Sequence, residues 1–157
     1  MRILCLSDSH KRGDIADRII AEQPTAKDIF FLGDLTRDIE DLQYIYTNRT
    51  FHIVSGNCDF CSEYPNTGLA NVGGVNILYT HGHTYGVKYG TGRLSEAAQA
   101  RNCKIALYGH THVANIAYEN GIYIVNPGSC SSSREGPNSY AVIDIEKNGI
   151  MPIIVRL

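Results

Sequence analysis

Short apolar runs rich in Ile, Val, Leu, Phe and Tyr recur along the chain, separated by polar and glycine-containing segments. Runs of this length and composition are typical of β-strands that are buried on one or both faces. The predicted strands are Arg2–Leu6, Ile29–Leu32, Thr50–Val54, Asn76–Thr80, Lys104–Tyr108, Ile122–Val125, Ser139–Ile145 and Ile150–Val155.

Between some of these runs, apolar residues recur three or four positions apart, which is the spacing of one face of an α-helix. Three such stripes predict three helices, the last of which begins near Thr91 or Gly92. The stripes are Ile15, Ile19 and Ile20; Ile39, Leu42, Ile45 and Tyr46; and Leu94, Ala97, Ala98 and Arg101.

Three dipeptides, Gly73-Gly74, Asn120-Gly121 and Asn148-Gly149, each separate two strand-like runs and predict β-hairpins. The first half of the chain therefore resembles a series of βαβ units, and the second half a series of antiparallel hairpins. A mixed α/β sandwich of two packed sheets accommodates both patterns. Because there is no repeat and no Pro/Ser-rich linker, we expect residues 1–157 to form one domain.

Composition narrows the class of protein. With 43% hydrophobic and 19% charged residues, the chain has the composition of a globular protein. A net charge of -2 argues against general nucleic-acid binding, and no apolar run is long enough for a membrane helix. The N-terminus leaves no room for a signal peptide, and five scattered cysteines suit reduced thiols, so we expect a cytoplasmic protein.

The polar residues that could bind a metal ion or take part in catalysis lie just after the predicted strands. Since sites in α/β sheets form beyond the carboxyl ends of strands, their order alone predicts one shared rim. The six segments are Asp8–His10, Gly33–Asp34, Gly56–Asp59, His81–His83, Gly109–His112 and Asn126–Ser129.

Carboxylates and imidazoles together suit divalent ions such as Mn, Fe, Zn, Co, Ni or Mg. Each segment alone has a simpler explanation: Asp8 or Ser9 as a helix cap, Gly33-Asp34 as a turn, and His110 and His112 as exposed residues. Five of the six histidines nevertheless lie in these loops, and the ordered set favours a metal centre.

Read in order, these segments resemble the motifs of the calcineurin-like metallophosphoesterase superfamily, and in particular its small single-domain prokaryotic phosphodiesterase branch. The resemblance implies a four-layer α/β/β/α sandwich, with two central mixed β-sheets flanked by helices. The motifs are Asp8-x-His10, Gly33-Asp34-x-x-Arg37, Gly56-Asn57-Cys58-Asp59, His81, Gly109-His110-x-His112 and Asn126-Pro127-Gly128-Ser129.

The resemblance further implies two divalent metal ions, with manganese as the first choice. Asp34 would bridge the two ions, and a hydroxide between them would attack a phosphoester in line. Asp8, His10 and His112 would complete one ligand set, and Asn57, His81 and His110 the other.

One position departs from the family pattern. Cys58 stands where most members have a histidine that protonates the leaving group or stabilises the phosphoryl oxygens. A thiol is a poor proton donor near neutral pH, and His83 could take over part of this role. The catalytic candidates are Asn57, Cys58, Asp59 and His83, with Lys11, Arg12 or Arg37 as possible phosphate contacts.

Three alternatives stay open. Cys58 and Cys61 spell a Cys-x-x-Cys pair, which also occurs in redox proteins and zinc half-sites. A second is a binding scaffold of the same fold, as a retromer subunit with this architecture looks to be. A third is a phosphomonoesterase or nuclease using the same site. We expect a small phosphoester as substrate, no membrane partner, and a surface compatible with a homo-oligomer.

Overall fold

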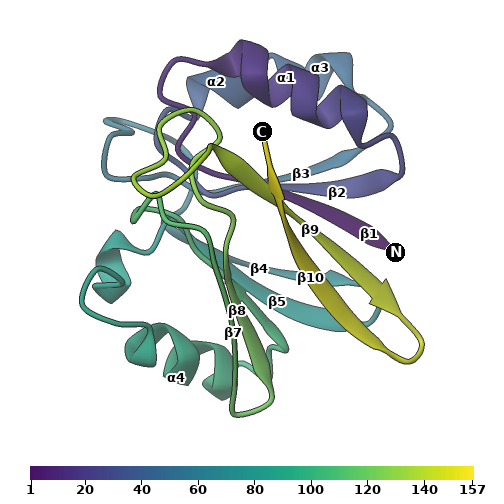
Figure 1. Ribbon diagram of the computed structural model, residues 1–157, viewed down its shortest axis with the longest axis vertical. Coiled ribbons are helices and arrows are strands. Elements are labelled where there is room, and N and C mark those ends of the chain that lie inside the picture. The colour runs from purple at the N-terminus through teal and green to yellow at the C-terminus, as the bar shows by residue number, and fades with distance from the viewer.

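Two five-stranded mixed sheets pack face to face in the computed structural model, which describes residues 1–157 (Figure 1). The first sheet has the order β10-β9-β1-β2-β3. Strands β1, β2 and β3 are parallel, whereas β9 and β10 run antiparallel to their neighbours. Its strands are β1 (Arg2–Leu6), β2 (Ala26–Phe31), β3 (Thr50–Ile53), β9 (Ser139–Glu146) and β10 (Gly149–Arg156).

The second sheet has the order β4-β5-β6-β8-β7. Its three central strands, β5, β6 and β8, are parallel, and an antiparallel strand closes each edge. Its strands are β4 (Thr67–Val72), β5 (Val75–Thr80), β6 (Ile105–Leu107), β7 (Asn115–Glu119) and β8 (Ile122–Asn126).

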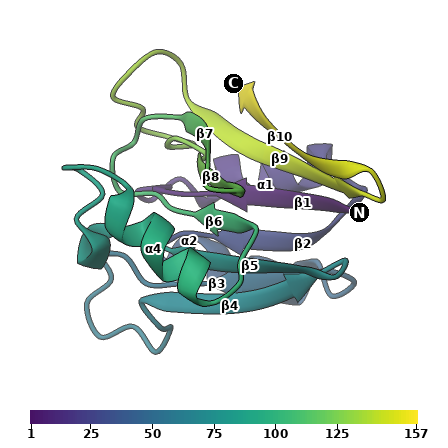
Figure 2. The same ribbon diagram turned by 90° about the horizontal axis from the view of Figure 1, so that it is seen from below.

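Helices cover the outer face of each sheet, as the two views in Figures 1 and 2 show. Three of them pack on the first sheet and one on the second. This arrangement confirms the predicted four-layer α/β/β/α sandwich. The helices are α1 (Gly13–Glu22), α2 (Arg37–Glu40), α3 (Leu42–Ile45) and α4 (Gly92–Ala100), with a short 3-10 turn η1 (His83–Tyr85).

The side-chain alternation of β1 separates two of the three apolar layers. Ile3 and Cys5 point into the layer between the sheets, whereas Leu4 and Leu6 point toward α1, α2 and α3. All four side chains are fully buried. Because successive strand residues face opposite sides, a strand buried on both faces must be apolar at every position.

The predicted hairpins are confirmed at all three turns, since β4 pairs with β5, β7 with β8 and β9 with β10. The division of the chain into a βαβ half and a hairpin half was too simple. Strands β5 and β6 are parallel and joined through α4, so the second half also contains a crossover. The helix near Thr91 and the strand Lys104–Tyr108 were both predicted, but the glycine-containing dipeptides mark only the tight turns and do not reveal a crossover.

The prediction of one helix from the apolar stripe at residues 39–46 was also only partly right. The structure has two four-residue helices there, and Ile45 is 64% exposed. Residues 39 and 42 of the stripe are buried against the first sheet, which is sufficient to hold the two turns in place. No helix in the structure has the length and apolar character needed to cross a membrane.

A bidentate ion pair joins β1 to β9, with Arg2 Nε and Nη2 donating to the Asp144 carboxylate at 2.9 and 2.8 Å. These hydrogen bonds are the main reason why the pKa of Asp144 is lowered. The pair therefore stabilises the fold above the ordinary carboxylate pKa, and this contribution is lost as the pH falls through the lowered value.

We expect Asp144→Asn to lower the free energy of unfolding by about 0.5 kcal/mol at pH 7, since the pair is partly exposed. The difference should shrink below about pH 4. Urea unfolding at pH 7 and pH 3 measures it, with Glu22→Gln at the exposed end of α1 as the control. An equal loss at both pH values would contradict the role of the ion pair.

Candidate metal centre

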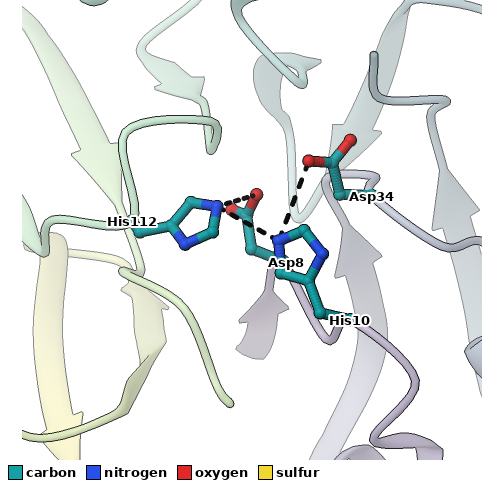
Figure 3. Close-up of side chains that lie close together, drawn as sticks. All are labelled: Asp8, His10, Asp34 and His112. Carbon is teal, nitrogen blue, oxygen red and sulfur yellow. Dashed lines mark hydrogen bonds and ion pairs between the residues drawn. The ribbon is translucent and has the colours of Figure 1, made fainter. Parts of the chain in front are cut away.

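Four acidic and histidine side chains from three strand exits converge at one edge of the sandwich (Figure 3). Asp8 and His10 follow β1, Asp34 follows β2, and His112 follows β6 of the other sheet. One potential ligand atom from each lies within 4.8 Å of all the others. The carboxyl ends of parallel strands in both sheets thus meet at one point.

A second group lies on the other side of Asp34. His81 Nε2 is 3.4 Å from Asp34 Oδ1, 3.1 Å from Asn57 Oδ1 and 3.2 Å from His110 Nδ1. On the first side, His10 Nε2 lies 3.9 Å from Asp34 Oδ2. The two oxygens of Asp34 are therefore directed toward different histidines.

These separations fit ligands that surround a cation. Two ligand atoms that are each about 2.1 Å from one ion lie about 3.0 to 3.4 Å apart at tetrahedral or octahedral angles. His112 Nε2 lies 3.1 Å from Asp8 Oδ1 and 3.2 Å from His10 Nε2. Asp8 is fully buried, and its Oδ1 has no hydrogen-bond partner, which is the condition of a carboxylate oxygen reserved for a metal ion.

Backbone carbonyls set the tautomers of two histidines. His81 Nδ1 donates to the Leu32 carbonyl at 2.7 Å, and His112 Nδ1 donates to the Ser132 carbonyl at 2.8 Å. A carbonyl oxygen only accepts, so the neutral rings carry their proton on Nδ1 and leave the Nε2 lone pair facing the cluster. Such outer hydrogen bonds orient and strengthen imidazole ligands.

The backbone at the candidate ligands is strained. Asp8, His10, Asp34, His110 and His112 all have φ between 44° and 68°. This left-handed region is unfavourable for residues with a Cβ, and it persists where the surrounding structure imposes it, most often at functional sites. Five of the seven residues proposed as ligands share this conformation.

Burial and mutual charges shift the pKa values of the cluster. Burial opposes ionisation of Asp8, but the contact of its Oδ1 with His112 Nε2 and the charges that His81 and His112 carry when protonated outweigh this, so its pKa is lowered. The same contact with Asp8 raises the pKa of His112. Burial, followed by the charge of His81, lowers the pKa of His110 to about 4, which leaves this imidazole neutral and able to ligate near pH 7.

Asp59, a catalytic candidate from the sequence, is bound to the backbone. Its two carboxylate oxygens accept hydrogen bonds from the amides of Asp34, Leu35, Thr36 and Gly56 at 2.7 to 2.9 Å. The carboxylate thus holds together the loops that follow β2 and β3. This arrangement is that of a positioning residue for Asp34.

Cys58 and His83 both lie beside the group of ligand atoms around His81. The Cys58 amide donates to Asp34 Oδ1 at 2.9 Å, while burial raises the pKa of its thiol to about 11, so the thiol stays protonated. The His83 ring lies 5.4 Å from that of His81 and 6.1 Å from that of His110, and its buried Nδ1 has no partner. Burial is also the main cause of a lowered pKa at His83.

The three basic residues considered as phosphate contacts, Lys11, Arg12 and Arg37, differ in whether their side chains already have a partner. The Arg12 guanidinium is paired with Asp14 at 2.8 and 2.9 Å. Arg37 begins α2 and lines a cavity beside Cys58, and the Lys11 amide donates to Asp38. All five cysteines, including the Cys-x-x-Cys pair, are free thiols.

Several residues outside the proposed ligand set support the ligand loops. Ser7 donates a hydrogen bond to Asp8 Oδ2, and Ser129 donates to the Asp8 carbonyl at 2.7 Å. Asn126 donates to the Gly109 carbonyl and to the Thr111 hydroxyl at 3.0 Å each. The sixth strand exit therefore supports the ligand loops, and only its Asn-Pro-Gly-Ser motif pointed to it.

Gly109 illustrates how closely the loops approach each other. A Cβ there would overlap the Ser7 hydroxyl and lie 2.9 Å from Asp8 Oδ2. We expect Gly109→Ala to displace the Asp8 carboxylate and weaken manganese binding about 10- to 100-fold, as measured by titration calorimetry. Gly92→Ala, at a glycine with open space around it, is the matched control. Unchanged affinity in Gly109→Ala would show that the carboxylate is not a ligand.

The fold and the Asp/His cluster together define a metallophosphoesterase. The chain belongs to the calcineurin-like phosphoesterase superfamily, whose domain profile matches residues 1–148. This confirms the resemblance drawn from the motifs, and the family and the cluster together support the binding of a divalent metal ion.

Similar proteins include a probable metallophosphoesterase, YsnB, of Bacillus subtilis, which is 27% identical over 94% of this chain and 86% of its own length. Vacuolar protein sorting-associated protein 29 of Schizosaccharomyces pombe is 35% identical over 82% of this chain and 66% of its own. The crystal structure of a predicted phosphoesterase from Streptococcus pneumoniae superposes with a TM-score of 0.88 at 28% identity, covering 99% of this chain and 88% of that one.

Proposed function

We propose that this chain is a single-domain phosphodiesterase that uses two divalent metal ions, with manganese as the first choice. The observation that carries the proposal is the placement of Asp34 between two groups of ligand atoms, with its Oδ1 3.4 Å from His81 Nε2 and its Oδ2 3.9 Å from His10 Nε2. A carboxylate with one oxygen toward each group is suited to hold two ions a few ångströms apart.

In this proposal Asp8, His10 and His112 complete one ligand set. Asn57, His81 and His110 complete the other. A bound pair of divalent cations supplies an activated water near neutral pH and neutralises charge on the phosphate. The chain contributes by holding the ligands on strained, hydrogen-bonded loops, so that little reorganisation is needed when substrate binds.

Hydrolysis of bis(p-nitrophenyl) phosphate and of p-nitrophenyl phosphate, each with manganese and with excess chelator, tests the proposal. We expect manganese-dependent release of p-nitrophenol, with the diester preferred over the monoester. A preference for the monoester would favour the phosphomonoesterase alternative. Release that is indifferent to metal and chelator would defeat the whole proposal.

A non-catalytic scaffold is the second candidate, favoured by the 35% identity to the sorting-associated protein. A scaffold is free to lose metal ligands, whereas this chain keeps a complete set of Asp, Asn and His side chains around Asp34. Absence of bound metal at micromolar manganese, together with absent hydrolysis, would favour the scaffold.

His83 supplies the imidazole that Cys58 does not, because it lies beside His81 and His110 with an unpartnered Nδ1. We expect His83→Ala to slow hydrolysis of an ester with a poor alkyl leaving group about 10- to 100-fold, and of a p-nitrophenyl ester much less. Steady-state rates on both esters test this, with His52→Gln as the control. Equal losses on the two esters would exclude a role at the leaving group.

A further inference from the structure

A cavity with a volume of about 870 Å³ lies between α2, α3 and the segment 58–64. Its wall includes Leu35, Cys58 and Asp59. Leu35 and Cys58 directly follow Asp34 and Asn57 in the chain, and the Cys58 amide donates to the Asp34 carboxylate. The cavity therefore lies beside the loops that carry Asp34 and Asn57.

Two aromatic side chains in this cavity are unusually open to solvent. Tyr44 of α3 is 82% exposed, and Phe60 of the opposite segment is 86% exposed. Tyr64, in the same wall, differs because it packs against the core and accepts a hydrogen bond from Gln43 at 3.1 Å. Large exposed aromatic side chains inside a concavity are characteristic of binding sites, where they stack on flat groups.

The charges around the cavity limit what it can hold. Its lining contains Glu40, Asp41, Asp59 and Glu63, but the only cation is Arg37. Even though Asp59 is engaged by backbone amides, the remaining carboxylates leave the wall negative. A second phosphate or a carboxylate on the substrate would be repelled here.

We propose that this cavity binds one of the two organic groups of a phosphodiester, and that it selects an uncharged aromatic group that stacks on Phe60 and Tyr44. Aryl and nucleoside groups have this chemistry. The inference rests on the proposed phosphodiesterase function, because it places the phosphate at the adjoining metal centre.

Two esters with the same reporter group test the selection: phenyl p-nitrophenyl phosphate and methyl p-nitrophenyl phosphate. We expect the ratio of their kcat/KM values to fall about three- to tenfold in Phe60→Ala and in Tyr44→Ala, which is the range expected for a stacked aromatic pair. Tyr118→Ala, which removes an exposed aromatic ring on β7, should leave the ratio unchanged.

The negative charge of the cavity wall predicts a further difference between substrates. A carboxyphenyl p-nitrophenyl phosphate should react more slowly than the phenyl ester in the wild-type protein, and Glu63→Gln should narrow the difference. The effect should diminish at high salt, because Glu63 is exposed at the surface.

A binding measurement separates the cavity from the catalytic activity. Titration calorimetry in the presence of manganese should show tighter binding of phenylphosphonate than of methylphosphonate, and Phe60→Ala should remove the advantage. Equal affinities, together with an ester ratio unchanged in both alanine variants, would overturn the inference alone. A phenyl preference in binding without hydrolysis of either ester would support the cavity and defeat the phosphodiesterase proposal.

Discussion

Replacing Asp34 by Asn is expected to lower the manganese-dependent hydrolysis of an aryl phosphodiester by at least about 100-fold. Substitution of groups that merely support a metal ligand already costs about 10- to 100-fold. The loss at Asp34 should be larger, because its two oxygens face His81 at 3.4 Å and His10 at 3.9 Å. An amide has one oxygen and no charge, so it cannot serve both sides.

Steady-state rates with manganese and elemental analysis of the bound metal measure this effect together. Asn retains an oxygen for the Cys58 amide, so the fold should persist. Asp144→Asn is the matched control. It makes the same substitution on β9, where Asp144 pairs with Arg2 of β1 and is not among the proposed ligands. Equal rates and equal metal content in Asp34→Asn and the wild-type protein would refute the bridging role.

The second large effect is expected at Asp59. Replacement by Ala removes an acceptor shared by four backbone amides, at Asp34, Leu35, Thr36 and Gly56. Hydrogen bonds to a charged group are among the stronger ones, and their loss leaves the amides in a crowded loop unpaired. We expect the free energy of unfolding to fall by about 2 to 4 kcal/mol.

Urea unfolding measures the stability change, and manganese titration measures the accompanying loss of affinity, expected at about 10- to 100-fold. Glu63→Gln removes a negative charge from the same segment without removing a hydrogen bond to the backbone, and it should unfold like the wild-type protein. If Asp59→Ala kept wild-type stability and manganese affinity but lost hydrolysis, Asp59 would be catalytic and not a positioning residue.

The layers of the fold followed closely from local patterns. The run Arg2–Leu6 is apolar in four of its five residues, and these four are buried in β1, while the stripe at Ile15, Ile19 and Ile20 became the buried face of α1. The Gly73-Gly74 and Asn120-Gly121 turns both joined antiparallel strands. Such features are visible in sequence because residue neighbours alone determine side-chain periodicity and turn geometry.

Other parts of the fold depended on distant contacts. Tertiary packing split the 39–46 stripe into α2 and α3, since only part of it meets the first sheet. The parallel pairing of β5 with β6 arises from the crossover through α4 and from the hydrogen bonds of neighbouring strands. The expected cytoplasmic location and a homo-oligomer stay predictions.

The sequence by itself determined the kinds of ligand and the strand exits that carry them, because both are properties of short segments such as Asp8-Ser9-His10. Only the tertiary structure decided which of these side chains face each other, and that the Asp59 carboxylate accepts hydrogen bonds from four backbone amides. It also decided that Tyr44 and Phe60 share one cavity. The physical reason is that these contacts join loops from separate strands and two sheets, and their meeting depends on sheet order and packing that no single segment specifies.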